Sequence, residues 1–245
     1  MGFTNGIYNR ITLLRAFIKL SRDPNQVESV LVMLEKIEQP ELLKKLAEGV
    51  KADEATARVM AQKPLIGRID LKAFKGLPEG TLGRAFANHI EAHQLDPNYF
   101  VTEKEVDEVS WVPARLRETH DLWHLLTGID MTPWGEVALQ AFYLAQIPSP
   151  LSALIIGAAI VNSLTRNPKQ FSGHLEAISY GWAMGKRSRP LIQVPWESLW
   201  DKPLGEVRRA WDIDPEGVRR FFGREGDSGS AATLASPPAP AGAAV

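Results

Sequence analysis

The amino-acid sequence predicts an all-α fold with a single multi-helix domain. Apolar residues recur at steps of three and four along most of the chain, which is the spacing of a helix with one buried face. No stretch shows the alternation of apolar and polar residues that is typical of a half-buried strand. Of the 245 residues, 44% are hydrophobic, which is enough apolar content for a large core.

Breaker residues mark the ends of the expected helices in the N-terminal half. Asp23-Pro24 is a start signal, and the helix that follows it is expected to stop at Pro40. The segment from Pro64 to Pro78 is expected to be a loop, and Asp96-Pro97 a turn. We therefore expect helices over residues 7–18, 27–37, 41–49, 53–62 and 82–94.

The C-terminal half carries similar signals, with a start near Val112-Pro113, a stop at Gly128 and a new start at Thr132-Pro133. Helices are expected over residues 113–127, 133–146, 150–165, 170–187 and 204–211. The all-helical domain is expected to span residues 1–223. Residues 224–245 are rich in serine, glycine, alanine and proline, and such a segment buries too little apolar surface to order itself, so a disordered tail is expected.

Composition excludes several classes of protein. The net charge of -1 gives no sign of a nucleic-acid partner. Because the chain has no cysteine, any metal must be bound by histidine, aspartate or glutamate. The N-terminus has no basic region followed by an apolar run, so a cytoplasmic protein is expected. The longest apolar stretch, residues 151–161, is shorter than the ~20 residues of a membrane span.

The most informative motif is a group of metal-ligating residue types at helical spacing. His120 and His124 are four residues apart and share one face of the expected helix, with Asp121 beside His120. Glu136 opens the next helix, and an antiparallel hairpin of the two helices would bring it against the histidines. Two imidazoles and one or two carboxylates form a metal site with open positions. The alternative is a solvated helix face, with Glu136 complementing a helix dipole.

Other polar residues have both a functional and a structural interpretation. His89 and His93 form a second pair four residues apart, for which a solvated helix end is favoured over a metal site. A structural or surface role is favoured for His174. Lys186 and Arg187 lie near a helix C-terminus, where they either complement the helix dipole or bind a carboxylate, a phosphate or an anionic membrane.

The apolar stretch over residues 137–164 is interpreted mainly as core, with a channel for a long-chain lipid as the alternative. Its small residues at 157–159 leave room for a linear ligand or for another helix, and a homodimer contact is a further possibility.

The motif, together with several other segments, resembles the fourth COQ protein family of ubiquinone biosynthesis. The string His120-Asp121-x-x-His124-x11-Glu136 matches that family's signature, and further resemblances occur in the family's order over about residues 65–213. These further segments are Leu77–Arg84, Gly128, Gly135-Glu136, Trp182–Ile192, Trp196 and residues 204–213.

The resemblance implies a divalent metal site at His120, Asp121, His124 and Glu136, usually described as zinc. Histidine and carboxylate ligands also bind Fe2+ and Co2+. The implied activity is oxidative decarboxylation of a 4-hydroxy-3-polyprenylbenzoate-type intermediate, with a hydroxyl replacing the carboxylate at ring carbon one. Lys186 or Arg187 is then expected either to neutralise the substrate carboxylate or to contact lipid headgroups.

The resemblance also implies partners and a location. These are a polyprenylated aromatic or quinone lipid, other ubiquinone-biosynthesis enzymes and peripheral contact with the membrane. The chain lacks the transit peptide of mitochondrial members, so a bacterial-type member at the cytoplasmic face of the inner membrane is expected. Two alternatives to the enzyme stay open: a prenyl-lipid-binding scaffold with a structural metal, and a metal-dependent hydrolase that would need His89, His93 or His174 as further ligands.

Overall fold

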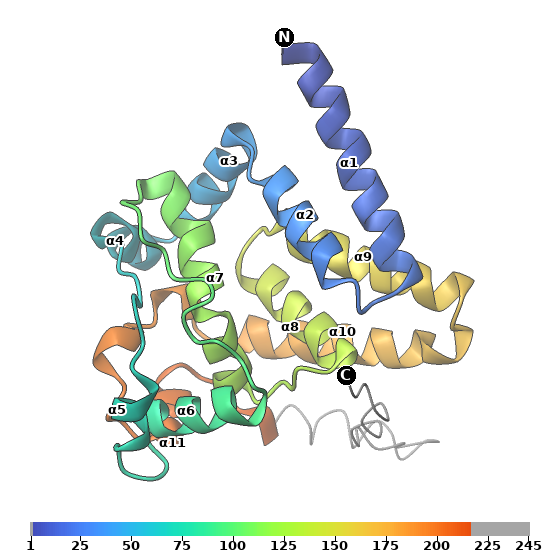
Figure 1. Ribbon diagram of the computed structural model, residues 1–245. Coiled ribbons are helices and arrows are strands. Elements are labelled where there is room, and N and C mark those ends of the chain that lie inside the picture. The colour runs from blue at the N-terminus through green and yellow to red at the C-terminus, as the bar shows by residue number, and fades with distance from the viewer. Residues whose placement is uncertain (1, 217–245) are drawn as a thin grey trace.

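The computed structural model describes residues 2–216, with side chains from residue 8 onward, and this part of the chain is all helical (Figure 1). The expected tail, residues 224–245, lies outside the described residues. The α-helices are α1 (Gly2–Arg22), α2 (Val27–Ile37), α3 (Pro40–Lys51), α4 (Glu54–Gln62), α5 (Leu71–Lys75), α6 (Leu82–Ala92), α7 (Glu108–Thr127), α8 (Pro133–Gln146), α9 (Pro150–Thr165), α10 (Phe171–Arg187) and α11 (Leu204–Ala210). Within residues 2–216, none of these helices is long and apolar enough to cross a membrane.

The helix that carries the histidine motif begins one turn earlier than expected. Asp107 accepts a hydrogen bond from the backbone N–H of Ser110, whose hydroxyl accepts one in return from the Asp107 N–H. This reciprocal cap fixes the start of α7 at Glu108, so that Pro113 lies inside the helix. The expected start near Val112-Pro113 is wrong because proline is most common in the first helical turn, whereas here the cap precedes it.

In the N-terminal half one expectation is confirmed and another needs correction. Helix α2 ends at Ile37, ahead of Pro40 as expected, and Pro40 also occupies the first turn of α3. The expected loop between Pro64 and Pro78 contains the short helix α5, whose first N–H groups donate to the side chain of Asp70. A one-turn helix is too short to show a period in the sequence.

The closest helix pair is α8 with α10, and glycines allow this approach. A Cβ added to Gly181 would lie 1.8 Å from the carbonyl oxygen of Ala138, so only glycine permits this separation of the two backbones. In order along the pair, Gly173, Gly181 and Gly185 of α10 face Trp134, Ala138 and Phe142 of α8. The two helices are therefore parallel, and their N-terminal ends lie together.

The described residues form two hydrophobic cores. The larger core joins α3, α4, α6, α7, α8, α10 and α11 around fully buried side chains such as Trp111, Trp123 and Phe142. The smaller core joins α1 and α2 to α9. Figure 1 shows that α1 extends away from the remaining helices toward its N-terminus.

Candidate metal centre

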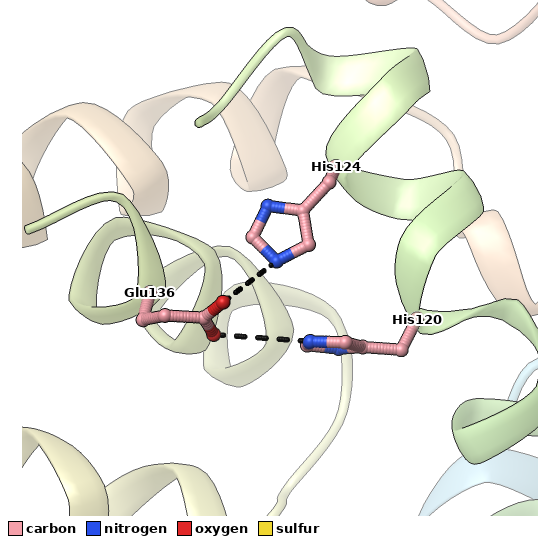
Figure 2. A group of neighbouring side chains, drawn as sticks. All are labelled: His120, His124 and Glu136. Carbon is pink, nitrogen blue, oxygen red and sulfur yellow. Dashed lines mark ion pairs between the residues drawn. The ribbon is translucent and has the colours of Figure 1, made fainter. Parts of the chain in front are cut away.

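Three of the predicted ligands come together where α7 meets the start of α8. The Nε2 atom of His124 lies 3.0 Å from Oε1 of Glu136, and Nε2 of His120 lies 3.8 Å from Oε2 of the same carboxylate (Figure 2). One ligand atom of each residue lies within 4.8 Å of the others. The two imidazoles meet edge to face, with ring centroids 4.9 Å apart. This spacing suits three side chains converging on one cation.

The connection between the two helices places Glu136 correctly. Gly128 ends α7 in the left-handed conformation, with φ of 69°, and its N–H donates to the carbonyl of His124. Thr132 caps α8 through the N–H of Gly135, and Pro133 occupies the first helical position. These are the stop and start signals expected from the sequence. They place Glu136 in the first turn of α8, facing back toward α7.

The two helices do not pack closely along their length as the expected hairpin would. The close partner of α8 is α10, and long side chains bridge α8 to α7. Trp123 of α7 stacks on Tyr143 of α8 at 4.2 Å and meets Phe142 edge to face at 5.6 Å. Aromatic rings thus fill the space between α7 and α8, and the metal-ligand group lies beside them.

The side chain of His124 is buried between a backbone carbonyl and the Glu136 carboxylate. Its Nδ1 lies 3.0 Å from the carbonyl oxygen of Ile129. Its Nε2 is buried and lies 3.0 Å from the Glu136 carboxylate, which is its partner in the metal-free protein. Imidazole nitrogens and a carboxylate that converge in this way are the donor types that divalent cations bind. The residues present therefore fit a divalent metal.

Mutual electrostatics distinguish the three groups. Burial by itself lowers the pKa of His124. The pKa nevertheless lies above 6.5, because the protonated ring is favoured by the contact with Glu136, by the charge of Glu136, by the Ile129 carbonyl and by the charge of Asp121. Burial raises the pKa of Glu136, but the two imidazoles outweigh it and lower the pKa below 4.5. Burial prevails at His120 and lowers its pKa. Without metal, the contact with Glu136 thus favours the protonated form of His124.

Asp121, the fourth predicted ligand, is not part of this group. It lines a small cavity bounded by α6, α7 and the segments around residues 66–69 and 96–101, together with Arg117 and Glu118. Its charge still acts on the centre, because it raises the pKa of His124. The structure therefore places Asp121 as a neighbour of the three-residue group.

Lys186 and Arg187 lie at the far end of the α8–α10 pair. A Cβ added to Gly185 would touch Ala145, which is nine residues beyond Glu136 on α8, or about 14 Å at 1.5 Å per residue. Both cations are exposed, and the ammonium of Lys186 lies 5.9 Å from the ring centroid of Trp182. The structure does not bring them to the metal-ligand group.

The other histidines stay outside the group as well. The rings of His89 on α6 and of His93, just beyond the end of α6, lie 4.7 Å apart. The expected solvated helix end is correct for the exposed His93 but wrong for His89, which is partly buried and whose pKa is lowered to about 4 by burial. His174 is buried, its Nδ1 lies 2.6 Å from the Ser163 hydroxyl, and its ring stacks on Trp134. Within residues 2–216, His120, His124 and Glu136 are the one group with metal-ligand spacing, so the further ligands of the hydrolase hypothesis are not assembled.

The apolar stretch divides between two environments. Residues 137–143 of α8 are buried, and Ala138, Leu139, Phe142 and Tyr143 among them belong to the larger core. Helix α9 has no charged residue, and its outer face exposes Val161 and Leu164. Gly157 faces the ring of Phe17 on α1, and Ala158 belongs to the smaller core, so the small residues accommodate α1. A lipid channel and a homodimer contact remain predictions.

Sequence reasoning missed two polar residues, of which one contacts the metal-ligand group and the other fastens loops to α7. The Tyr143 hydroxyl lies 3.3 Å from Nδ1 of His120. The Glu118 carboxylate accepts hydrogen bonds of 2.7 Å from the N–H groups of Ile66 and Thr102, which fastens two loops to α7. Tyr143 follows Glu136 by about two helical turns, so its place on the same face of α8 was a usable signal. No sequence signal links Glu118 to loops so distant in the chain.

Comparison with known proteins identifies relatives over most of the chain. The family model described as "Coenzyme Q (ubiquinone) biosynthesis protein Coq4" matches residues 8–216. The mitochondrial ubiquinone biosynthesis protein COQ4 of Yarrowia lipolytica is 29% identical over 206 residues, which cover 81% of this chain and 77% of that protein. The corresponding Lodderomyces elongisporus protein is 30% identical over 179 residues, which cover 71% of this chain. The chain spans only 47% of the length of that second relative.

A solved structure agrees with these sequence matches. A crystal structure of a Nostoc punctiforme protein, named as a ubiquinone biosynthesis protein, superimposes with a TM-score of 0.72 at 27% identity. The superposition covers 84% of this chain and 99% of the other.

Proposed function

Because this chain belongs to the coenzyme Q (ubiquinone) biosynthesis protein Coq4 family, we propose that it acts in ubiquinone biosynthesis through a divalent metal held by His120, His124 and Glu136. The observation that carries the proposal is the convergence of one ligand atom each from His120, His124 and Glu136 within 4.8 Å of one another. Zn2+ is the metal proposed first, with Fe2+ and Co2+ as the alternatives that the same ligands accept. Asp121 is proposed as an electrostatic partner or a fourth ligand.

The proposed reaction replaces the ring carboxylate of a 4-hydroxy-3-polyprenylbenzoate-type lipid with a hydroxyl group. The para hydroxyl supplies electron density to the carbon that bears the carboxylate. One oxygen atom of dioxygen forms a bond to that carbon, the bond to the carboxylate breaks, and carbon dioxide leaves as the ring regains aromaticity. The second oxygen atom leaves as water, with two electrons and two protons supplied by an external two-electron reductant. When bound, a divalent cation supplies positive charge that orients and polarises a carboxylate or phenolate.

The chain's own residues have defined tasks in this proposal. His124 is held in one orientation by the Ile129 carbonyl, and Glu136 by its place in the first turn of α8. Because the pKa of His124 is raised, metal binding there competes with protonation. The aromatic rings between α7 and α8 exclude water from one side of the centre.

We further propose that the chain contacts the membrane peripherally, at the cytoplasmic face of an inner membrane, through the outward face of α1. Helix α1 contains no acidic residue. Its outward face exposes Tyr8, Ile11, Leu14 and Ile18. Arg10, Arg15, Lys19 and Arg22 share this helix. An apolar stripe with cations and no anions suits a bilayer that contains anionic lipid.

Lys186 and Arg187 are proposed to contact lipid headgroups, because their distance along α8 from Glu136 is too great for them to reach the same ring carboxylate. Co-sedimentation with vesicles with and without phosphatidylglycerol tests the membrane proposal. Charge reversal at Arg15 and Lys19 is expected to abolish the anionic-lipid dependence. Charge reversal at Arg58, which is exposed on α4, is the control.

A second candidate function is a prenyl-lipid-binding scaffold that organises other ubiquinone-biosynthesis enzymes around a structural metal. The observation that favours it is burial, since the side chains of His124, His120 and Glu136 are 0%, 28% and 34% exposed. A metal in this position joins α7 to α8, which is a structural task.

One experiment separates the two functions. Cells that lack the protein are supplied with wild type or Glu136→Gln, and their lipids are examined by mass spectrometry, with soluble protein levels as the control. The enzyme proposal expects the variant to accumulate a prenylated intermediate that retains its ring carboxylate. Normal quinone levels with the variant would contradict the enzyme proposal, and loss of several partner enzymes together would favour the scaffold.

A further inference from the structure

The metal-ligand group has a second contact between α7 and α8, at Tyr143. Its hydroxyl lies 3.3 Å from Nδ1 of His120, on the side of the ring away from the Nε2 that faces Glu136. The His120 and Tyr143 rings are nearly parallel, at 17°, with centroids 6.2 Å apart. Glu136 and Tyr143 thus contact opposite nitrogens of one imidazole, and both belong to α8.

Burial and stacking fix the position of the Tyr143 hydroxyl. Tyr143 is 5% exposed, and its ring lies 4.2 Å from that of Trp123 at an interplanar angle of 8°. Trp123 is fully buried and follows His120 by three residues on α7. The stack on Trp123 therefore fixes the position of the Tyr143 ring beside His120. His120 itself has a side chain that is 28% exposed and is not held by burial alone.

The two histidines are oriented in different ways. Nδ1 of His124 contacts a backbone carbonyl, which any residue at position 129 would supply. Nδ1 of His120 contacts a side chain, so this orientation depends on the amino acid at position 143. An imidazole that binds a metal through Nε2 carries its proton on Nδ1, and an acceptor for that proton fixes the tautomer and the ring.

We propose that Tyr143 is a positioning residue that accepts the Nδ1–H of His120 and holds its Nε2 toward the metal position, thereby setting the affinity of the centre. This inference rests on the proposed metal centre.

Tyr143→Phe tests the inference, because it removes the hydroxyl and keeps a ring that stacks on Trp123. The full chain is stripped of metal and titrated with Co2+, whose visible absorption reports both affinity and ligand geometry. Loss of an outer partner of a ligating histidine weakens metal binding by about 10- to 100-fold, and we expect a decrease of that size with a changed absorption spectrum.

The matched control is Phe142→Leu. Phe142 packs edge to face on the same Trp123, so its replacement disturbs the same core. The Tyr143 hydroxyl and its contact with His120 stay in place. Wild-type Co2+ affinity is expected for the control. Equal losses in both variants would overturn the positioning role in favour of general packing.

The remaining outcomes separate the two proposals. If wild type and Tyr143→Phe bind Co2+ with equal affinity, the proposed role of Tyr143 is overturned and the proposed metal centre is not. Wild type that binds no Co2+ would overturn the metal centre and, with it, the role of Tyr143.

Discussion

Replacing Glu136 by glutamine removes one of the three ligands and its negative charge while nearly preserving its shape. Its two oxygens lie 3.0 Å and 3.8 Å from the two histidines, and no other described carboxylate belongs to this group. A metal at 100 times its Kd stabilises the folded state by about 2.7 kcal/mol. For a chain of this size each kcal/mol shifts Tm by about 2–4 °C, which gives a shift of about 5–11 °C for wild type.

The same arithmetic fixes the result for the variant. Loss of a direct ligand should weaken binding by at least the ~100-fold upper value found for outer partners, so the same metal concentration contributes about 0.4 kcal/mol or less. The corresponding shift in Tm is below about 2 °C. Differential scanning calorimetry of chelator-treated protein, with and without added Zn2+ or Co2+, measures both shifts. A full shift in Glu136→Gln would refute the reasoning, because the metal would then bind elsewhere.

Three further predictions follow from the same structure. In the metal-free protein, the free energy of unfolding of wild type should exceed that of Glu136→Gln most between pH 4.5 and 6.5. The raised pKa of His124 loses its stabilising effect as pH rises, and the lowered pKa of Glu136 loses its stabilising effect as pH falls. Urea unfolding across pH measures this difference, and a difference that grows above pH 6.5 would contradict the prediction. In thermal unfolding, Gly181→Ala should destabilise the fold by about 3 kcal/mol, since its Cβ would lie 1.8 Å from a carbonyl oxygen of α8. Gly157→Ala, whose Cβ would lie 3.6 Å from the nearest ring atom of Phe17, should change stability by about 1 kcal/mol or less. Arg115→Ala should cost about 3 kcal/mol in the same assay, because this fully buried guanidinium pairs with a carboxylate and a backbone carbonyl; a change near zero would show that the pair contributes nothing net.

The fold was predictable wherever capping or breaker residues mark the ends of a helix. Thr132-Pro133 and Gly128 act within a few residues of themselves, so the bounds of α8 and the end of α7 follow directly from the sequence. The start of α7 was misplaced because a reciprocal cap at Asp107 precedes the proline. Helix α5 was missed because a helix of five residues shows no periodicity.

The candidate site was likewise predictable where it depends on spacing along one helix, and not where it depends on how helices pack. His120 and His124 had to share a face once the segment was helical, since residues four apart always do. Asp121, one residue from His120, points toward another cavity, and Lys186 lies at the far end of the α8–α10 pair. Neither placement depends on spacing along a helix, because both depend on how separate helices are oriented.

The all-helical class could be predicted from the sequence, because helical periodicity and capping are local properties of the chain. The order and spacing of the motifs indicated the family, and the short link between α7 and α8 brings three of the predicted residues together. The surroundings of these residues could not be predicted. The parallel approach of α10 to α8 through glycines, the aromatic stack of Trp123 on Tyr143 and the burial of His124 each depend on contacts between distant segments. These contacts set the desolvation and the local charges, and therefore whether a pair of histidines becomes a solvated helix face or a metal centre.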